Sequence, residues 1–239
     1  MGRDSGPIVI VPAFNEVECI AGVVDDVRSA GYRVVVVDDG SSDRTAAAAG
    51  AAGAVVIRLP INLGVGGAMR TGFRYAVDHC APCVIQVDAD GQHEPGQIEA
   101  LLAELERSDA DLVIGSRFAS GGTYEMSVVR RWCIGVLAAA IRRSGGIAVT
   151  DPTSGFRAIR SPLLEAFAVD FPQSYLGDTF EATLVAARQG YRITEVPVTM
   201  RQRQGGSPSA DLFGLVRAMT RALTILLTGP SIDLPARPA

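Results

Sequence analysis

The run of valines at 34–37 constrains the fold more than any other stretch of the sequence. A continuous apolar run of β-branched residues predicts a strand that is buried on both faces of a sheet. The run ends in Asp38-Asp39-Gly40, and an Ala-rich helix is expected from about Thr45. A sheet that is buried on both faces needs helices on both sides, so the sequence predicts an α/β fold.

The same alternation of strand and helix extends through the first half of the chain. Further strands are expected at 8–11, 54–57, 84–87 and 112–115, and further helices at 16–29 and 95–107. The Gly-rich loop at 62–67 is expected to open another helix, which runs to about residue 79. Asn15 is in the right position to cap the helix at 16–29. This order predicts a doubly wound, mostly parallel sheet flanked by helices, with ligands bound at the carboxyl ends of the strands.

The second half of the chain is less regular. Helices are expected at 126–141, 179–189 and 212–227, and strands within 151–160 and 191–200. Pro197 indicates that the last of these strands lies at an edge of the sheet. We expect a single domain at 7–228, between disordered segments at 1–6 and 229–239.

Two carboxylates follow the predicted strand at 84–87. Asp88 and Asp90 are two residues apart, so an extended backbone points both side chains to the same side. Paired hard oxygen ligands suit a divalent cation that also holds a diphosphate. A solvated turn is the alternative, because Asp and Gly are common turn residues.

Two further clusters lie at predicted strand ends. Asp38 and Asp39 are candidates to accept hydrogen bonds from a nucleotide base or ribose, although helix capping would also explain them. The glycines at 64, 66 and 67 resemble a dinucleotide-binding loop, but the loop follows the third strand rather than the first. Close approach to a nucleotide and simple loop geometry are both consistent with these glycines.

Several charged residues of the second half are candidates for the reaction itself. Arg117 follows the fifth strand, and Arg130, Arg131, Arg201 and Arg203 are further cations able to surround phosphate groups. Any one of them taken alone is more typical of a solvated surface. Asp178 and Glu181 begin a helix, where an acid acts either as a general base or as a partner of the helix dipole.

Composition limits the class of protein. The net charge is −4, which argues against a general nucleic-acid binder. The polar start of the chain indicates no secretory signal, and the apolar stretch at 212–227 is too short and too charged for a membrane span. Cys80 and Cys83 have the spacing of a redox pair, but their positions at a helix end and a strand start favour packing.

Five ordered motifs together resemble glycosyltransferase family 2, in its polyprenyl (dolichyl) phosphate mannose and glucose synthase-like branch. The motifs are Val11-Pro12-Ala13-Phe14-Asn15-Glu16, Val37-Asp38-Asp39-Gly40-Ser41, Asn62-Leu63-Gly64, Asp88-Ala89-Asp90 and Ser154-Gly155-Phe156-Arg157. The resemblance covers roughly residues 7–210. It implies a GT-A fold, a nucleotide-sugar donor, Mg²⁺ or Mn²⁺, and inversion at the anomeric carbon. The half at 7–116 would then bind the nucleotide sugar, and the half at 117–228 the acceptor.

The resemblance also implies roles for individual residues. The metal ligands would be Asp88, Asp90 and Gln92. Arg117 and Arg131 would face an acceptor phosphate, and Arg203 would lie in a loop over the donor diphosphate. The residues implied to contact the nucleotide sugar are Pro12, Ala13, Phe14, Glu16, Asp38, Asp39, Gly67, Asp88, Ala89 and Asp90.

The acceptor stays open at this point. The related lipid-phosphate enzymes usually carry Ser four residues after the acceptor-helix Arg, whereas Gly135 follows Arg131 at that spacing. Gly177-Asp178 resembles the acidic pair of branches in which Asp is the base for a hydroxyl acceptor. A polyprenyl phosphate would need no base, and the helices near Trp132 and Leu223 would then lie on a membrane surface.

The expected function is metal-dependent transfer of mannose or glucose from GDP-mannose or UDP-glucose to a polyprenyl phosphate. The alternatives are transfer to a sugar or metabolite hydroxyl with Asp178 as base, a nucleotidyltransferase, and a non-catalytic nucleotide- or lipid-binding module. We expect no nucleic-acid partner. The expected location is the cytoplasm, with peripheral attachment to the membrane or to a membrane protein where the acceptor is a lipid.

Overall fold

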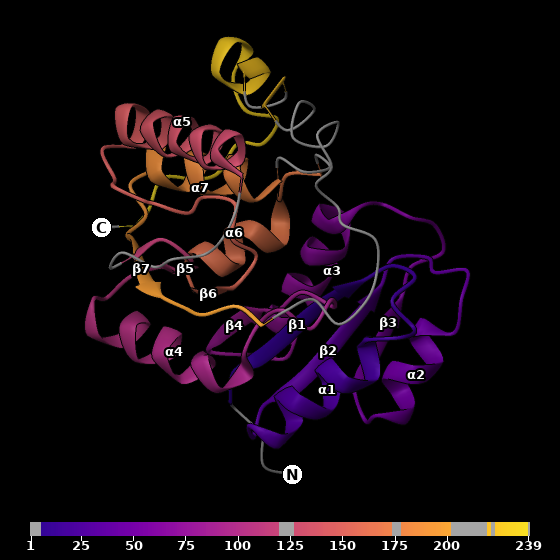
Figure 1. Cartoon of the computed structure of the whole chain (residues 1–239). Helices are drawn as coiled ribbons and strands as arrows, with labels where there is room; N and C mark the ends of the chain where they lie inside the picture. Colours follow the sequence, from indigo (N-terminus) through magenta and orange to yellow (C-terminus); the bar gives the residue numbers. More distant parts are fainter. Residues whose placement is uncertain (1–5, 120–126, 174–177, 202–218, 221–222, 239) are drawn as a thin grey trace.

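The computed structural model describes residues 6–119, 127–173, 178–201, 219–220 and 223–238. In these residues a seven-stranded sheet is flanked by helices on both faces (Figure 1). The strands are β1 (Ile8–Ala13), β2 (Arg33–Asp38), β3 (Val55–Arg58), β4 (Cys83–Gln86), β5 (Leu112–Ser116), β6 (Arg157–Arg160) and β7 (Ile193–Pro197). The predicted α/β class and the mostly parallel sheet are therefore confirmed.

The helices follow the strands in the predicted alternation. They are α1 (Ile20–Ser29), α2 (Thr45–Ala51), α3 (Val65–Asp78), α4 (Ile98–Arg107), α5 (Val128–Gly145), α6 (Leu163–Val169) and α7 (Asp178–Arg188), with a 3-10 turn at Pro95–Gln97 before α4. Residues 219–220 and 223–228 are also helical. Among the described residues, no helix is both long enough and apolar enough to cross a membrane.

The strand order places a switch point beside β1. The order is β3-β2-β1-β4-β6-β5-β7, so the chain leaves β1 toward β2 on one side and returns to β4 on the other. Strands β1 to β4 pair in parallel, while β6 is antiparallel to both β4 and β5. Pro197 lies in β7 at the edge of the sheet, as predicted from its missing backbone donor. The carboxyl ends of β1, β2 and β4 therefore meet at one edge.

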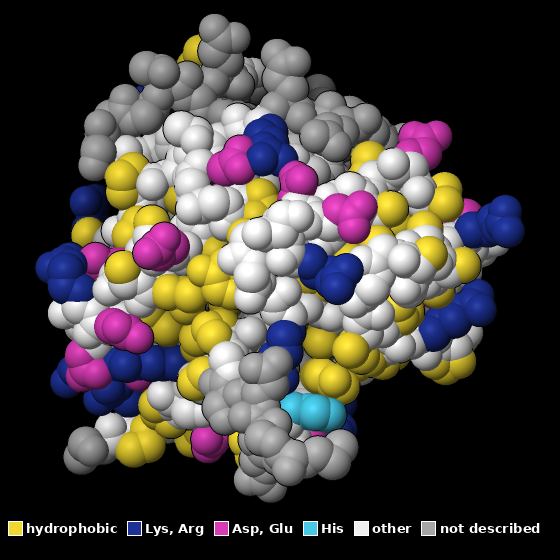
Figure 2. Space-filling view, turned by 90° about the horizontal axis from the view of Figure 1, so that it is seen from below, with side chains coloured by type: hydrophobic (Ala, Val, Ile, Leu, Met, Phe, Trp, Pro, Cys, Tyr) yellow, Lys and Arg dark blue, Asp and Glu magenta, His cyan; other side chains and the backbone are white. Residues whose placement is uncertain are grey.

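Two buried clusters fill the two faces of the sheet. Alternation along β1 sends Ile8 and Ile10 to one cluster and Val9 and Val11 to the other, and all four side chains are buried. Helices α3, α6 and α7 cover the first face, with α5 packed on α7, and α1, α2 and α4 cover the second (Figure 1). Acidic and basic side chains lie interspersed on the surface that is seen from below (Figure 2).

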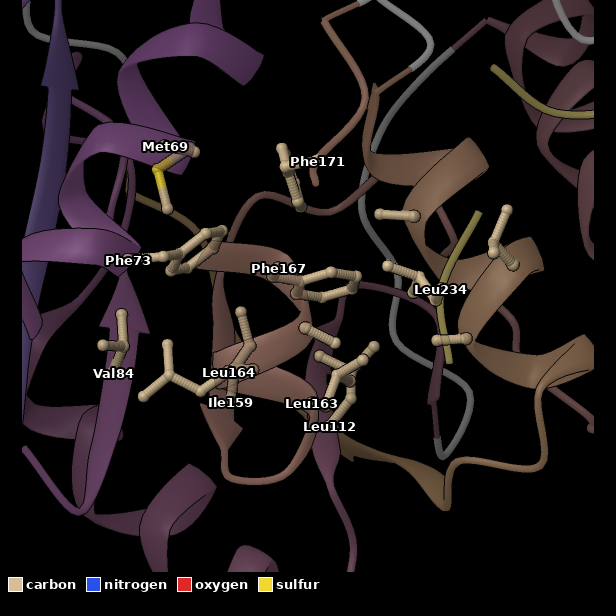
Figure 3. Close-up of a cluster of buried hydrophobic side chains, with 14 of the residues drawn as sticks. Met69, Phe73, Val84, Leu112, Ile159, Leu163, Leu164, Phe167, Phe171 and Leu234 are labelled. Carbon is tan, nitrogen blue, oxygen red and sulfur yellow. The ribbon is translucent and has the colours of Figure 1, made fainter. Parts of the chain in front are cut away.

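Aromatic packing joins α3 to α6 in the first cluster. The ring of Phe73 lies 5.9 Å from that of Phe167 and 5.2 Å from that of Phe171, and these two rings meet edge to face at 5.0 Å. Figure 3 shows these rings together with Leu163 and with Leu234, which belongs to the C-terminal segment. Helix α6 was not predicted from the sequence.

The C-terminal segment corrects one prediction. Residues 229–238 were expected to be disordered, but Ile232 and Leu234 are buried in the first core cluster. Arg237 makes an ion pair with buried Asp111 at 2.6 Å, and the backbone N–H of Arg237 donates to the carbonyl of Gln189. The segment packs in spite of its prolines because alternate side chains enter the core.

A second correction concerns the first helix. Helix α1 begins at Ile20 rather than at 16, and Asn15 does not cap it. The Asn15 side chain instead accepts a hydrogen bond from the backbone N–H of Ser42, and the Asn15 N–H donates to Ser41 Oγ. Asn15 has φ 56°, a left-handed conformation that Asn tolerates better than most residues. Contacts between distant loops therefore replace the local cap.

Candidate active site at the carboxyl edge of the sheet

The first strand leads into a loop that is held by the loop after β2. Pro12 and Ala13 end β1, and Phe14 follows with 46% of its surface exposed. The N–H of Glu16 donates to Thr45 Oγ1 at 2.9 Å, which adds to the two hydrogen bonds of Asn15. These contacts fix the loop at 12–16 and leave the Phe14 ring open to solvent at the switch-point edge.

The two acids at the end of β2 are buried and hold neighbouring loops. Asp38 accepts a hydrogen bond from the N–H of Ser41 and lies 3.3 Å from Arg58 Nε. The two oxygens of Asp39 accept from the N–H groups of Leu63 and Gly64, at 2.7 and 2.8 Å. Burial raises the pKa of Asp39 even though these hydrogen bonds oppose the shift. Both acids thus shape the loops, and each carboxylate oxygen retains further acceptor capacity.

The glycines that open α3 allow close packing. A Cβ on Gly66 would lie 1.8 Å from the carbonyl oxygen of Pro172, and one on Gly67 would lie 2.5 Å from the Leu63 side chain. Gly64 has φ 81°, which favours glycine. These close approaches give the glycines a structural reason, and a contact between Gly67 and a nucleotide stays a prediction.

Asp88 has two close neighbours, His93 from the same turn and Gly155 from a distant part of the sequence. Its N–H donates to Nδ1 of His93 at 3.0 Å, and its Oδ2 lies 3.7 Å from His93 Nε2. A Cβ on Gly155 would lie 2.6 and 2.7 Å from the two oxygens of Asp88, so only glycine leaves room for this carboxylate. The Asp88 side chain is 41% exposed, while Ala89 is buried. The strand end therefore presents a held carboxylate to solvent.

Asp90 and Gln92 complete the predicted set of metal ligands. The turn between them contains Gly91 at φ 74°, and the N–H of Gln92 donates to Asp90 Oδ1 at 3.0 Å. Among the described residues, no three His, Cys, Asp or Glu side chains form a group that could hold a metal ion. Two carboxylates and one amide nevertheless suit Mg²⁺ or Mn²⁺ when the phosphates of a substrate supply further ligands. The residues present therefore fit the implied cation in the form of a shared site.

A buried cation and a buried acid lie beside this edge. Arg157 is 2% exposed, and its guanidinium donates to the carbonyls of Ser154, Pro152 and Thr179 and to the Thr183 hydroxyl. Burial lowers the pKa of Arg157 to about 10, and the charges of nearby acids oppose this shift.

Asp178, at the start of α7, is also buried. Burial raises the pKa of Asp178 to about 6; its hydrogen bond from the N–H of Thr179 and the charge of Arg157 oppose the shift, and the charge of Asp88 adds to it. The Asp88 carboxylate thus lies close enough to Asp178 to raise the pKa of Asp178. An acid with a pKa near 6 is ionised at neutral pH and suited to accept a proton.

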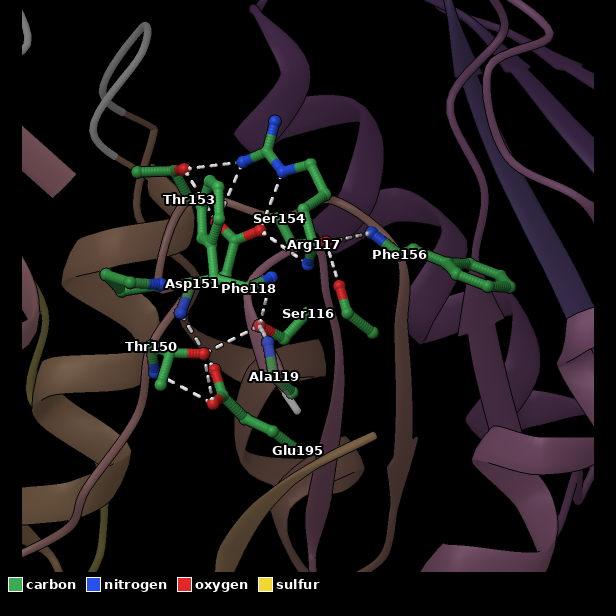
Figure 4. Close-up of polar contacts among 12 residues, drawn as sticks. Ser116, Arg117, Phe118, Ala119, Thr150, Asp151, Thr153, Ser154, Phe156 and Glu195 are labelled. Atoms are coloured by element: carbon green, nitrogen blue, oxygen red, sulfur yellow. Dashed lines mark hydrogen bonds and ion pairs between the residues drawn. The ribbon is translucent and has the colours of Figure 1, made fainter. Parts of the chain in front are cut away.

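Arg117, which was expected to face an acceptor phosphate, is paired with a buried acid. Its Nε and Nη2 donate to the two oxygens of buried Asp151 at 2.6 and 2.7 Å, and Nη2 also donates to Thr153 (Figure 4). The carboxylate of Glu195 in β7 in turn accepts hydrogen bonds from the backbone N–H groups of Asp151 and Thr150. Arg117 is therefore held in a buried polar network that joins the ends of β5 and β7.

Two further predicted arginines belong to the second half of the chain. Arg131 is exposed on α5, and Arg203 lies outside the described residues. Reasoning from sequence missed His93 and Asp151. His93 lies within the same turn as the acids, so its spacing of five residues from Asp88 was an available signal, whereas nothing in the sequence pairs Asp151 with Arg117.

Comparison with known proteins agrees with the motifs. The sequence model described as glycosyl transferase family 2 matches residues 8–167. An undecaprenyl-phosphate mannosyltransferase of Micrococcus luteus is 35% identical over 208 residues, which are 83% of this chain and 85% of that protein. A polyprenol monophosphomannose synthase of Mycolicibacterium smegmatis is 32% identical over 210 residues, 83% of this chain and 78% of that protein.

A solved structure shows the same fold. Glucosyl-3-phosphoglycerate synthase from Mycobacterium tuberculosis, in complex with Mn²⁺, UDP and phosphoglyceric acid, superposes with a TM-score of 0.73 at 21% identity. The likeness covers 96% of this chain and 80% of that one, and it confirms the predicted GT-A fold. The family model matches more than half of the chain, and the relatives match most of it. The chain therefore belongs to glycosyl transferase family 2 and is a glycosyltransferase.

Proposed function

We propose that this glycosyltransferase moves mannose or glucose from a nucleotide diphosphate sugar to a polyprenyl phosphate, with inversion at the anomeric carbon. The observation that carries the proposal is the likeness over most of the chain to the two polyprenyl-phosphate mannose enzymes. GDP-mannose and UDP-glucose are the two donors to be tested. The paired acids at the strand end support a donor that contains a diphosphate.

The donor would lie across the switch-point edge. The exposed Phe14 ring and the loop at 12–16 are available to contact the base. The buried acids Asp38 and Asp39 and the first turn of α3 at Gly67 would line the same end of the sheet. Asp88 and Asp90, with Gln92, would hold Mg²⁺ or Mn²⁺ against the diphosphate, and Ala89 between them would line the same surface. Once bound, the cation would neutralise charge that develops on the departing diphosphate. Arg203 would add a further positive charge there.

The acceptor phosphate is assigned to the arginines of the second half. An oxygen of the phosphate would attack the anomeric carbon as the bond from that carbon to the diphosphate breaks, and no general base is needed because the oxygen is already charged. Arg117 and Arg131 would bind the phosphate. The buried Asp151 compensates part of the Arg117 charge and fixes the direction of its guanidinium, which favours one orientation of the acceptor.

A lipid acceptor also implies contact with a membrane surface. On α5, Val128, Val129 and Trp132 are 84%, 57% and 66% exposed. In the last described helix, Leu223 and Leu227 are 56% and 76% exposed. Exposed apolar side chains on two helices suit peripheral attachment at the headgroup boundary. Co-flotation with liposomes tests this attachment. The wild type should float with the liposomes, and a Trp132→Ser/Leu227→Ser double variant should not.

Asp178 supports a second candidate, transfer to a hydroxyl group. A hydroxyl acceptor needs a base, and Asp178 is a buried acid with a pKa of about 6 that is electrostatically linked to Asp88. The solved structure with similar fold is named for a glucosyl-3-phosphoglycerate product. The two candidates therefore make opposite predictions for Asp178.

One experiment separates them. Wild type, Asp178→Asn and Asp90→Asn are assayed with GDP-mannose and UDP-glucose, each with undecaprenyl phosphate or with 3-phosphoglycerate, in the presence of Mg²⁺ or Mn²⁺. The proposal predicts that wild type and Asp178→Asn both form lipid-linked product. The transfer rate should fall at least about a hundredfold in Asp90→Asn, and no product should form after the metal is chelated. Transfer to the hydroxyl acceptor alone, abolished in Asp178→Asn, would replace the proposal with the second candidate.

A further inference from the structure

His93 is the one histidine of the chain that is buried beside the catalytic edge, and the sequence motifs assign it no role. His93 is 4% exposed, and its ring stacks on that of Phe156, with the ring centroids 4.9 Å apart and an interplanar angle of 18°. Phe156 is itself 1% exposed. The imidazole therefore has a fixed plane, because rings packed in this way have little freedom to rotate.

Both ring nitrogens of His93 face the same residue. Nδ1 accepts a hydrogen bond from the Asp88 backbone N–H at 3.0 Å, so Nδ1 carries no proton and the ring proton is on Nε2. Nε2 lies 3.7 Å from Asp88 Oδ2, which is longer than a hydrogen bond but close enough for attraction between the N–H dipole and the carboxylate. One ring thus contacts both the main chain and the side chain of Asp88.

Gly155 also lies against the Asp88 carboxylate, because a Cβ at this residue would lie 2.6 Å from Oδ2. Gly155 precedes Phe156, the ring on which His93 stacks. The Asp88 carboxylate is therefore confined by the His93 ring and by the Gly155 backbone. The Asp88 side chain is still 41% exposed, so solvent reaches the carboxylate.

The backbone of His93 is also tied to the segment that follows β7. His93 forms an isolated antiparallel bridge with Met200, and the N–H of Arg201 donates to the carbonyl of Gln92 at 2.8 Å. Arg201 then pairs with Glu94 through two hydrogen bonds. The turn that carries His93 is therefore anchored independently of its side chain, so replacing the ring is expected to leave the turn in place.

We propose that His93 is a positioning residue for the cation site: its imidazole holds the main chain and the carboxylate of Asp88 in the orientation that binds Mg²⁺ or Mn²⁺. The inference rests on the cation site proposed above. Partners of metal ligands in this position commonly change metal affinity by roughly ten- to a hundredfold when they are removed.

The test uses the two histidines of the chain as a matched pair. His93→Phe keeps a ring for stacking on Phe156 and removes both nitrogens. His79→Phe makes the same chemical change at the exposed end of α3, where the ring stacks on Tyr75 at 3.8 Å. Mn²⁺ binding is measured by electron paramagnetic resonance, with GDP and with UDP, and the unfolding midpoint is measured for each variant.

We expect the Mn²⁺ dissociation constant to rise roughly ten- to a hundredfold in His93→Phe and to stay within about twofold of wild type in His79→Phe, which is far from the acids. Wild-type Mn²⁺ affinity in folded His93→Phe would overturn the role of His93. Failure of the wild type to bind Mn²⁺ with either nucleotide would overturn the cation site as well. If the wild type binds Mn²⁺ normally but transfers no sugar to undecaprenyl phosphate, the proposed function is overturned and the cation site is not.

A second measurement does not depend on a stable His93→Phe variant. In folded His79→Phe the imidazole signals come from His93, and nitrogen-15 NMR distinguishes the two tautomers. The proposal requires the Nε2–H tautomer, and it requires this proton resonance to move when Mg²⁺ and the nucleotide are added. An Nδ1–H tautomer, or a resonance that does not respond to the cation, would refute it.

Discussion

The packing of the C-terminal segment gives a sharp test, because disorder and burial predict opposite effects of one substitution. Leu234 is 3% exposed and contributes to the cluster that contains Phe167 and Leu163 (Figure 3). We predict that Leu234→Ala destabilises the whole domain. The control is Leu227→Ala, the same chemical change at a side chain that is 76% exposed.

The expected loss of unfolding free energy is about 3 kcal/mol. Leu→Ala removes three buried carbon groups at about 0.8 kcal/mol each, and incomplete collapse of the cavity adds a further term. For a chain of this size, each kcal/mol lowers the melting temperature by about 2–4 °C, so the midpoint should fall by about 6–12 °C. Leu227→Ala should stay within about 0.5 kcal/mol of wild type.

Urea unfolding followed by circular dichroism measures both variants, with hydrogen exchange at 229–238 as a second readout. A Leu234→Ala variant no less stable than Leu227→Ala would refute the packed segment and restore the disorder that its proline content suggests. Equal urea slopes for the three proteins are required, because a changed slope would indicate a change in the unfolded state.

Three further predictions follow from side chains near the site. Gly66→Ala should lower the free energy of unfolding by about 3 kcal/mol because its Cβ would meet the Pro172 carbonyl. Gly22→Ala in α1, where the added Cβ has open space, should raise the free energy of unfolding by about 1 kcal/mol, and thermal unfolding of both variants compares them. Asp151→Asn should cost about 3–5 kcal/mol because the buried Arg117–Asp151 ion pair loses its negative member. Asp109→Asn, at an exposed ion pair, should lower the urea midpoint much less, and equal midpoints for the two variants would contradict this prediction. Burial raises the pKa of Asp178 to about 6, so the folded protein holds that proton over a range where the unfolded chain has lost it, and stability falls as pH rises from about 4 through 6. In Asp178→Asn up to about 3 kcal/mol of this fall in stability should be absent. If the stability curves of wild type and Asp178→Asn run parallel from pH 4 to 7, the raised pKa of Asp178 is excluded.

The first half of the fold could be predicted because each strand there is a short apolar run that ends in polar or glycine residues. That pattern is local, and the parallel strands at β1, β2 and β4 follow from it. Helix α6 was missed because its seven residues are too few to establish a helical period. The C-terminal segment was misjudged because burial of Ile232 and Leu234 depends on a surface that only the folded chain provides.

The site shows the same division between local and distant information. The acids after β2 and β4 could be found because they follow strands directly. The Asn15 cap was wrong because Ser41 and Ser42, more than twenty residues away, offer the Asn15 backbone and side chain better partners than the helix does. The pairing of Arg117 with Asp151 spans 34 residues and has no local pattern. Charges that neutralise each other across such distances become visible only in three dimensions.

The distribution of charge at the edge supports the cation site that we propose at Asp88. Arg117 is committed to Asp151 by two hydrogen bonds, and the donors of Arg157 are directed to carbonyl and hydroxyl oxygens. Among the described residues, the contact of the Asp88 carboxylate with a basic side chain is the 3.7 Å approach of His93 Nε2. The Asp88 charge also raises the pKa of Asp178, so negative charge accumulates on this side of the sheet. A divalent cation shared with a diphosphate would relieve that repulsion, and Mg²⁺ with nucleotide should therefore lower the pKa of Asp178, a shift that carboxyl-labelled NMR can measure.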